Sequence, residues 1–168
     1  MQVSIEQLNP MAQDDFIALL GHIFEGTPGI AEQVWVDRPF ANVLDLHGKM
    51  VAIVEQMPLS QQIELIKAHP ELGSRSQMAD ASVQEQASVG FNHISPSLYE
   101  RLKQLNLTYR QKFGVPFVMA IKGQTREKVL AEFEHRLHHS KEQEIQTALR
   151  EIAKIARFRL SDLVMEMP

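Results

Sequence analysis

The stretch SKEQEIQTALREIAKIARFRLSDLVM, residues 140–165, decides the fold class because it predicts one long amphipathic helix. Ser140 can cap the first turn, and Gln143, three residues later, completes a capping box. The apolar stripe of this helix consists of Ile152, Ile155, Ala156 and Leu163. Since these positions recur at helical spacing, we expect a helix from about Lys141 to Met165 with one face packed inward.

The same helical periodicity recurs along most of the chain. Asn9 is expected to cap a helix that begins at Pro10, and Ser60 to cap a later one. Ser95 precedes a proline at the start of a long helix, and Gly114 suits its C-terminal end. The other expected helices cover approximately residues 10–24, 30–36, 43–57 and 60–69, a short stretch from Ser82, and residues 125–138.

The stretch VPFVMAI, residues 115–121, does not fit the helical pattern. It is apolar, contains Pro116 and is followed by Lys122-Gly123. We interpret it as an extended buried segment or as a loop that joins two helices. No repeat, low-complexity tract or linker divides the chain. We therefore predict an all-α, single-domain helical bundle over residues 1–168, with one extended loop segment near residues 115–121.

The composition is that of a globular protein and excludes several kinds of chemistry. Of the 168 residues, 44% are hydrophobic and 23% are charged, and the net charge of −4 gives no general attraction to nucleic acid or an anionic membrane. The absence of cysteine excludes disulfides, thiolate nucleophiles and cysteine-ligated metals. No apolar run reaches the length of a membrane span, and no signal peptide is recognisable. Cytosol is compatible with the absence of cysteine, and we expect a cytoplasmic protein.

Seven histidines raise the question of a metal site, but their spacing does not predict one. Glu132 and His135 have the Glu-x-x-His spacing of carboxylate-bridged metal sites in helical bundles, which need a second copy that this chain lacks. His135, His138 and His139 lie among charged residues that include Arg136. We interpret this cluster as a solvated helix face and expect no bound metal.

His69 is an ionisable residue placed directly before a proline, at the end of a predicted helix. Because Pro70 disfavours helical backbone in the residue before it, the helix should stop at or before His69. The helix dipole there favours the protonated imidazole and burial opposes it, and the two effects together favour titration near neutral pH. His69 is therefore a candidate general acid–base, although an ordinary helix-end histidine would look the same.

Two further places allow both a structural and a functional interpretation. Ser82 and Glu85 have the spacing of a capping box, which would explain both residues but not the neighbouring Gln86. Arg159 falls on the inward stripe of the last helix, whereas Arg157 does not. A buried arginine needs an anionic or carbonyl partner, and that partner is either a structural carboxylate or a ligand.

Four stretches, taken together and in order, resemble the family of 2-oxo-4-hydroxy-4-carboxy-5-ureidoimidazoline (OHCU) decarboxylases. They are LIKAHPELG at residues 65–73, SVQEQ at 82–86, KFGVPFV at 112–118 and EIAKIARFRL at 151–160. The resemblance covers most of the chain, and the ordered set is specific although each motif alone is weak. In one departure from the family, Leu20 precedes Gly21 where members often carry a cysteine, and this position looks like packing.

The resemblance implies an all-helical enzyme that converts OHCU to (S)-allantoin during urate degradation, without metal or organic cofactor and as a homodimer. The catalytic residues would be His69, Glu85 and Arg159. The substrate-binding residues would be Pro70, Ser82, Gln86, Phe117, Val118 and Ile121. The alternative is a non-catalytic helical interaction module, in which the same residues form a helix end, a cap and an ion pair.

Overall fold

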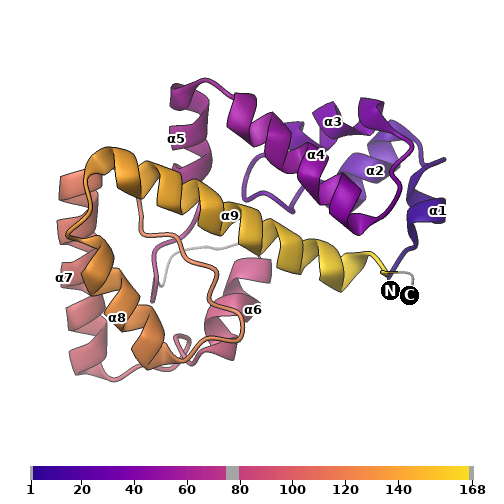
Figure 1. The fold of residues 1–168 in the computed structure, drawn as a ribbon. Coiled ribbons are helices and arrows are strands. Elements are labelled where there is room, and N and C mark those ends of the chain that lie inside the picture. Colours follow the sequence, from indigo (N-terminus) through magenta and orange to yellow (C-terminus); the bar gives the residue numbers. More distant parts are fainter. Residues whose placement is uncertain (1, 75–79, 167–168) are drawn as a thin grey trace. The chain divides into compact units, whose positions relative to one another are not determined.

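The computed structural model is built from helices, which confirms the predicted all-α class (Figure 1). It describes residues 2–74 and 80–166, and within these ranges it contains no β-strand, only an isolated parallel bridge between Val3 and Val164. The elements are α1 (Ile5–Leu8), α2 (Gln13–Leu20), α3 (Gly29–Val34), the 3-10 helix η1 (Trp35–Asp37), α4 (Val43–Gln56), α5 (Leu59–Lys67), α6 (Asp80–Ser88), α7 (Pro96–Phe113), α8 (Arg126–Arg136) and α9 (Lys141–Leu163). None of the described helices is both long enough and apolar enough to span a bilayer.

The chain forms two compact units. The first unit consists of Met1–Ala68 together with Ala153–Pro168, and the second consists of His69–Ile152. Helix α9 therefore contributes residues to both units. The prediction of a single domain over residues 1–168 stays a prediction.

In the first unit, helix α3 packs against both α2 and α4 (Figure 1). The core side chains of this unit include Leu8, Phe16, Ile30, Val34, Leu46, Met50 and Leu160, all of them fully buried. His47 of α4 donates from Nε2 to the carbonyl of Ala153 in α9, 2.7 Å away, and so links these two helices. Leu20 is also buried, as the interpretation of its position as packing requires.

Local capping signals start and end several helices where the sequence predicts. Ser140 Oγ accepts from the backbone N–H of Gln143 at 3.2 Å, and Gln143 Oε1 accepts from the backbone N–H of Ser140 at 2.9 Å, which confirms the capping box. Ser95 accepts from the backbone N–H of Leu98 at the start of α7. Gly114 ends α7 with a left-handed φ of 74°.

Three predicted caps are wrong. Asn9 lies at the C-terminal end of α1, and its side chain binds the backbone of Phe40 instead, accepting from the N–H at 2.8 Å and donating to the carbonyl at 3.0 Å. Ser60 lies inside α5 rather than before it. Ser82 lies inside α6, so Ser82 and Glu85 do not form the capping box considered above. Tertiary packing, and not the nearest residue of capping type, decides where these helices begin.

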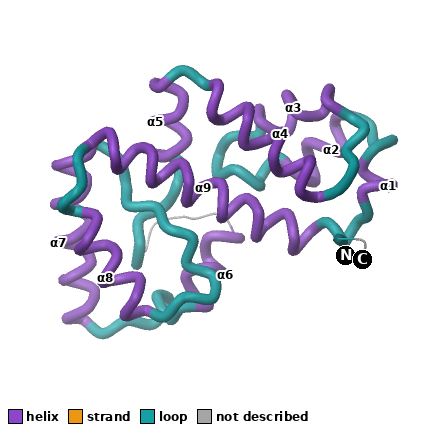
Figure 2. The backbone as a smooth tube through the Cα atoms, in the orientation of Figure 1, coloured by secondary structure: helices purple, strands orange, loops and turns teal. Residues whose placement is uncertain are grey.

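Residues 115–121 form the predicted extended segment between α7 and α8, which Figure 2 shows as a loop. Phe117 of this segment is buried, and its ring stacks on that of Phe133, with the centroids 4.0 Å apart and the planes 5° from parallel. Tyr109 meets both rings edge-on at 5.7 Å. These aromatic contacts make the segment part of the core of the second unit.

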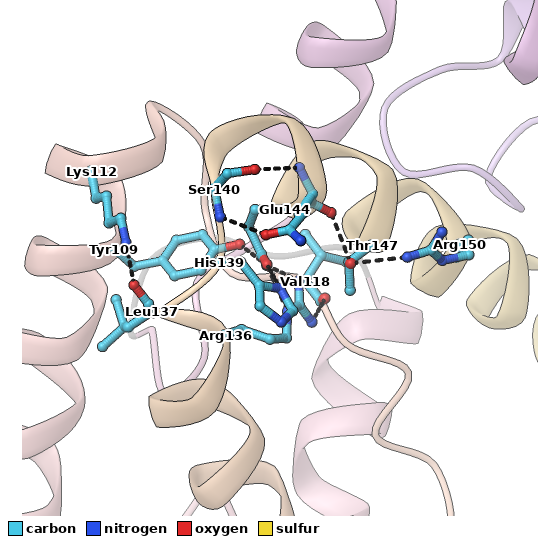
Figure 3. A network of polar contacts seen from close by, with 11 residues as sticks. Tyr109, Lys112, Val118, Arg136, Leu137, His139, Ser140, Glu144, Thr147 and Arg150 are labelled. Atoms are coloured by element: carbon cyan, nitrogen blue, oxygen red, sulfur yellow. Dashed lines mark hydrogen bonds and ion pairs between the residues drawn. The ribbon is translucent and has the colours of Figure 1, made fainter.

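A buried ion pair holds this segment in place (Figure 3). Arg136 is fully buried and donates from Nη1 to the carbonyl of Val118 at 2.7 Å and from Nε to Glu144 Oε1 at 2.6 Å. Its guanidinium also lies 4.4 Å from the centre of the Phe117 ring. The hydroxyl of Tyr109 donates to the same carboxylate oxygen, and burial raises the pKa of Tyr109, so that the phenol keeps its proton.

The predicted solvated face at the end of α8 is correct only in part. His135 and His138 are exposed, as expected. Arg136 is fully buried, and the partly buried His139 places Nδ1 2.9 Å from Glu144 Oε2. This part of the prediction is wrong because the partner of Arg136 is a carboxylate on the next helix, which helix spacing does not show.

Substitution by alanine is expected to change the free energy of unfolding in opposite directions at two glycines, Gly114 and Gly48. Gly114→Ala places a side chain at a left-handed position and should lower the free energy of unfolding by about 1 kcal/mol. Gly48→Ala lies in the exposed interior of α4, where a Cβ meets no neighbouring atom, and should raise the free energy of unfolding by about 0.5–1 kcal/mol. Urea unfolding followed by circular dichroism measures both. If both substitutions changed the free energy of unfolding in the same direction, the assigned backbone conformations would be contradicted.

The buried ion pair predicts a strongly non-additive mutant cycle. Arg136→Met leaves the Glu144 carboxylate buried without its cation and should lower the free energy of unfolding by about 3–5 kcal/mol. Adding Glu144→Met removes the remaining charge and should recover a large part of that loss. The control is the pair Arg101–Glu134, whose half-exposed side chains should show a coupling of less than about 1 kcal/mol. Urea unfolding of each variant gives the two coupling energies. Similar coupling energies for Arg136–Glu144 and Arg101–Glu134 would contradict the description of the first pair as a buried ion pair.

Candidate active site

His69 lies just beyond α5, in the segment of residues 69–74 that we call the His69 loop. The last helical residue is Lys67 and the cap is Ala68, which confirms that the helix stops before His69. The histidine is buried, with 6% of its surface exposed, and the following Pro70 is half-buried. His69 is thus the first residue of this loop and of the second unit, directly after the cap of a helix that belongs to the first unit.

Helix α6 carries the predicted serine, glutamate and glutamine. Ser82 and Gln86 are four residues apart, on the same face of the helix, and both are buried. Glu85 is half-buried. The serine thus has a buried position inside a helix, which a capping role does not explain.

Gln86 joins α6 to the His69 loop. Its Oε1 accepts from the backbone N–H of Gly73 at 3.0 Å, and its Nε2 donates to the carbonyl of Glu71 at 3.2 Å. The structure thereby brings together two stretches that the sequence treats as separate motifs. Gln86 was predicted only to bind substrate, and the structure shows that its amide also fixes backbone next to the candidate acid–base.

The predicted substrate wall lies in the extended segment of the same unit. Phe117, Val118 and Ile121 are all buried. The carbonyl of Val118 accepts from Arg136 at 2.7 Å, and the carbonyl of Ile121 accepts from the backbone N–H of Gln124 at 3.0 Å. These bonds fix the path of the segment, and reasoning from the sequence missed the contribution of Arg136.

Arg159 is buried in the first unit, where it pairs with Glu25. Its Nη1 lies 2.8 Å from Glu25 Oε2, and the two side chains are 5% and 7% exposed. The same nitrogen lies 3.4 Å and 3.5 Å from the carbonyls of His22 and Ile23. The inward orientation of Arg159 is confirmed. Glu25 is the carboxylate partner that the structural ion-pair interpretation requires. Sequence reasoning missed Glu25, whose only signal is an acidic residue directly after the apolar stripe that ends at Phe24.

All predicted site residues except Arg159 belong to the second unit. The two units are separate groupings of the chain, so a shared site for Arg159 and His69 is a proposal. Among residues 2–74 and 80–166, no group of three or more histidine and carboxylate side chains is arranged to hold a metal ion.

Comparison with known proteins places the chain in one family. The family model for OHCU decarboxylase matches residues 9–161. A 2-oxo-4-hydroxy-4-carboxy-5-ureidoimidazoline decarboxylase from Haloferax volcanii is 40% identical over 161 residues, which cover 96% of each chain. A protein of the same name from Xenopus laevis is 32% identical over 167 residues, 97% of this chain and 95% of that one. The uric acid degradation bifunctional protein PucL of Bacillus subtilis is 40% identical over 97% of this chain, which spans 33% of that longer protein.

Two solved structures share this fold. An (S)-allantoin synthase matches 97% of this chain with a TM-score of 0.80 and 28% identity, and this chain spans 54% of that one. An OHCU decarboxylase crystallised in the presence of (S)-allantoin matches with a TM-score of 0.70 and 22% identity, which is a likeness of fold alone. The family model and the relatives that match over nearly their full length both show that the chain belongs to the OHCU decarboxylase family.

Proposed function

We propose that this chain converts OHCU to (S)-allantoin without a cofactor, with His69 as the general acid–base. Membership of the family makes it a decarboxylase, a carbon–carbon lyase of urate degradation, and favours the enzyme over the helical interaction module. The observation that carries the assignment of His69 is its position. It is a buried imidazole directly beyond a helix end, in a loop whose backbone Gln86 fixes.

The chemistry needs somewhere to place an electron pair. When the bond to the carboxyl carbon breaks, carbon dioxide leaves and the two bonding electrons stay on the ring carbon. Many decarboxylases use pyridoxal phosphate or thiamine diphosphate to delocalise such a pair. In OHCU the pair can delocalise into the conjugated ring of the substrate, and the reaction is completed by adding one proton to carbon. The protein therefore has to hold the ring and control protons on one of its faces.

His69 is proposed to control those protons. Its imidazole would take the proton of the hydroxyl or carboxyl group and return one proton to carbon, acting in turn as base and acid. Delivery from one side of the ring yields a single enantiomer. The buried surroundings of His69 keep bulk water, which would protonate either face, away from the reacting carbon.

The remaining side chains of the second unit are proposed to bind the substrate. Ser82, Glu85 and Gln86 lie on one helix and can hydrogen-bond the ureido N–H groups or the hydroxyl. Pro70 would contact the substrate, and backbone groups of the wall residues Phe117, Val118 and Ile121 would hydrogen-bond its planar ring. The anchoring of the wall by Arg136 supports this role, because a fixed wall holds the ring in one orientation.

Arg159 is proposed to bind oxygens of the substrate through its planar guanidinium. Its pairing with Glu25 supports the proposal in one respect, because the carboxylate orients the guanidinium and balances its charge in a buried position. This role requires Arg159 and His69 to act on the same substrate molecule. We also propose that residues 1–168 work as one domain, since the family model spans both units. The expected homodimer, which rests on the family resemblance, and the cytoplasmic location, which rests on the sequence composition, are both kept as proposals.

The role of His69 is tested with the substitution His69→Gln. Removing the acid–base should lower the rate of (S)-allantoin formation about 100-fold or more. Substrate is generated in situ from urate by the preceding enzymes, and the chirality of allantoin is followed by circular dichroism. The matched control is His138→Gln, at an exposed histidine that should leave the rate unchanged. Wild-type activity of a folded His69→Gln protein would exclude His69 as the acid–base.

The substitution Arg159→Lys tests whether the guanidinium of Arg159 binds the substrate. Lysine keeps the positive charge beside Glu25 but loses the planar fork, so KM should rise about tenfold or more. Arg157→Lys, two residues earlier on the same helix and paired with Glu166, is the control and should leave KM unchanged. Steady-state kinetics in the same coupled assay give both values, and an unchanged KM in Arg159→Lys would count against the role.

A further inference from the structure

Helix α7 contacts the His69 loop through one residue in each of three consecutive turns. Leu102, Asn106 and Arg110 are spaced four residues apart and therefore lie on one face of the helix. Leu102 packs against Gly73, since a Cβ built on that glycine would lie 2.8 Å from Leu102 Cδ1. The loop and the helix are therefore in direct van der Waals contact at this point.

The other two residues continue the contact in register. Asn106 donates from Nδ2 to the carbonyl of Leu72 at 3.0 Å, and Arg110 forms an ion pair with the side chain of Glu71. Moving along α7 toward its C-terminus thus corresponds to moving back along the loop from Gly73 toward His69. The loop runs antiparallel to the helix face, with one contact per helical turn.

The contact made by Asn106 is the most demanding of the three. Asn106 is 7% exposed and Leu72 is 5% exposed, so the hydrogen bond between them is shielded from water. A buried carbonyl that loses its donor costs about 1–3 kcal/mol, because water cannot replace the bond. The hydrogen bond from Asn106 therefore fixes the position of the Leu72 carbonyl.

Little freedom separates this fixed carbonyl from His69. The ring of Pro70 locks its own φ angle. Gln86 holds the carbonyl of Glu71 and the N–H of Gly73, on either side of the bond made by Asn106. The backbone torsions left to vary are the ψ angles of His69 and Pro70 and the φ angle of Glu71, and the side chain of His69 adds its own χ1 and χ2. The position of the His69 Cα–Cβ bond, from which the imidazole extends, is thus set largely by where Glu71, Leu72 and Gly73 are held.

We propose that Asn106 is a positioning residue for His69, acting through the carbonyl of Leu72 and together with Gln86. This proposal rests on the proposed role of His69 as the acid–base. Displacing a catalytic group by about 1 Å can reduce the rate about 100-fold even when the substrate still binds. Asn106 therefore governs the chemical step and leaves the substrate contacts of the other residues in place.

The test is Asn106→Leu, which keeps the number and branching of the side-chain heavy atoms and removes the amide donor. We expect kcat to fall about tenfold or more while KM changes less than about twofold. The matched control is Asn9→Leu, which removes a loop-holding amide that makes two hydrogen bonds to the backbone of Phe40 in the first unit. The control should lose stability and keep the wild-type kcat, measured well below its melting temperature.

A second readout does not depend on turnover. In protein labelled with 15N-histidine, the His69 imidazole, assigned by its loss in His69→Gln, should give one sharp set of signals in the wild type and broadened or multiple signals in Asn106→Leu. If Asn106→Leu does not fold, Asn106→Ala replaces it, because the smaller side chain also removes the donor to the Leu72 carbonyl and cannot clash with its neighbours, and the same fall in kcat is expected.

Three results would overturn the inference. They are an unchanged kcat in the folded variant, a rise in KM without a fall in kcat, and imidazole signals identical to those of the wild type. The failure of the proposed function is a different result, namely wild-type activity in His69→Gln. In that case the imidazole signals still report whether Asn106 positions His69.

Discussion

Backbone polar groups outside helices have to find hydrogen-bond partners, and this requirement organises the structure. Within a helix the N–H and carbonyl groups satisfy one another, whereas most non-helical segments of an all-α protein have no neighbouring strand to pair with. Here side chains supply the partners. Asn9 binds the backbone of Phe40, Gln86 and Asn106 bind the His69 loop, and Arg136 binds the carbonyl of Val118. All candidate site residues except Arg159 lie on or beside the last two segments, so their geometry depends in part on Asn106 and Arg136, which are not proposed to touch the substrate.

The two buried ion pairs illustrate different uses of the same chemistry. Arg136 and Glu144 are both fully buried, and the pair also binds a backbone carbonyl and a tyrosine hydroxyl. A buried pair is a weak source of stability, because desolvation of both charges offsets most of their attraction. We interpret this one as fixing the extended segment. Arg159 and Glu25 are slightly more exposed, and in the proposed function the arginine has a second partner in the substrate.

What could be predicted from the sequence depends on how far apart the interacting residues are. The caps formed by Ser140 and Ser95 involve residues three positions away, so their spacing identifies them. The partner of Asn9 lies 31 residues away, and Asn9 was wrongly assigned as a helix cap for that reason. Arg136 was misassigned to a solvated face because its carboxylate lies on the next helix. The identities of the site residues came from resemblance to a family, whereas the contacts that hold them came only from the structure.

The motif LIKAHPELG shows why resemblance alone does not separate catalysis from support. Leu65 and Ile66 are buried side chains of α5, as any amphipathic helix requires. Gly73 is needed because its φ of 71° is left-handed and because Leu102 leaves no room for a side chain. Packing and backbone geometry explain these three positions, and they leave the identity of His69 unexplained. The other positions determine where that imidazole points, and they can be as restricted in sequence as the imidazole itself without taking part in the reaction.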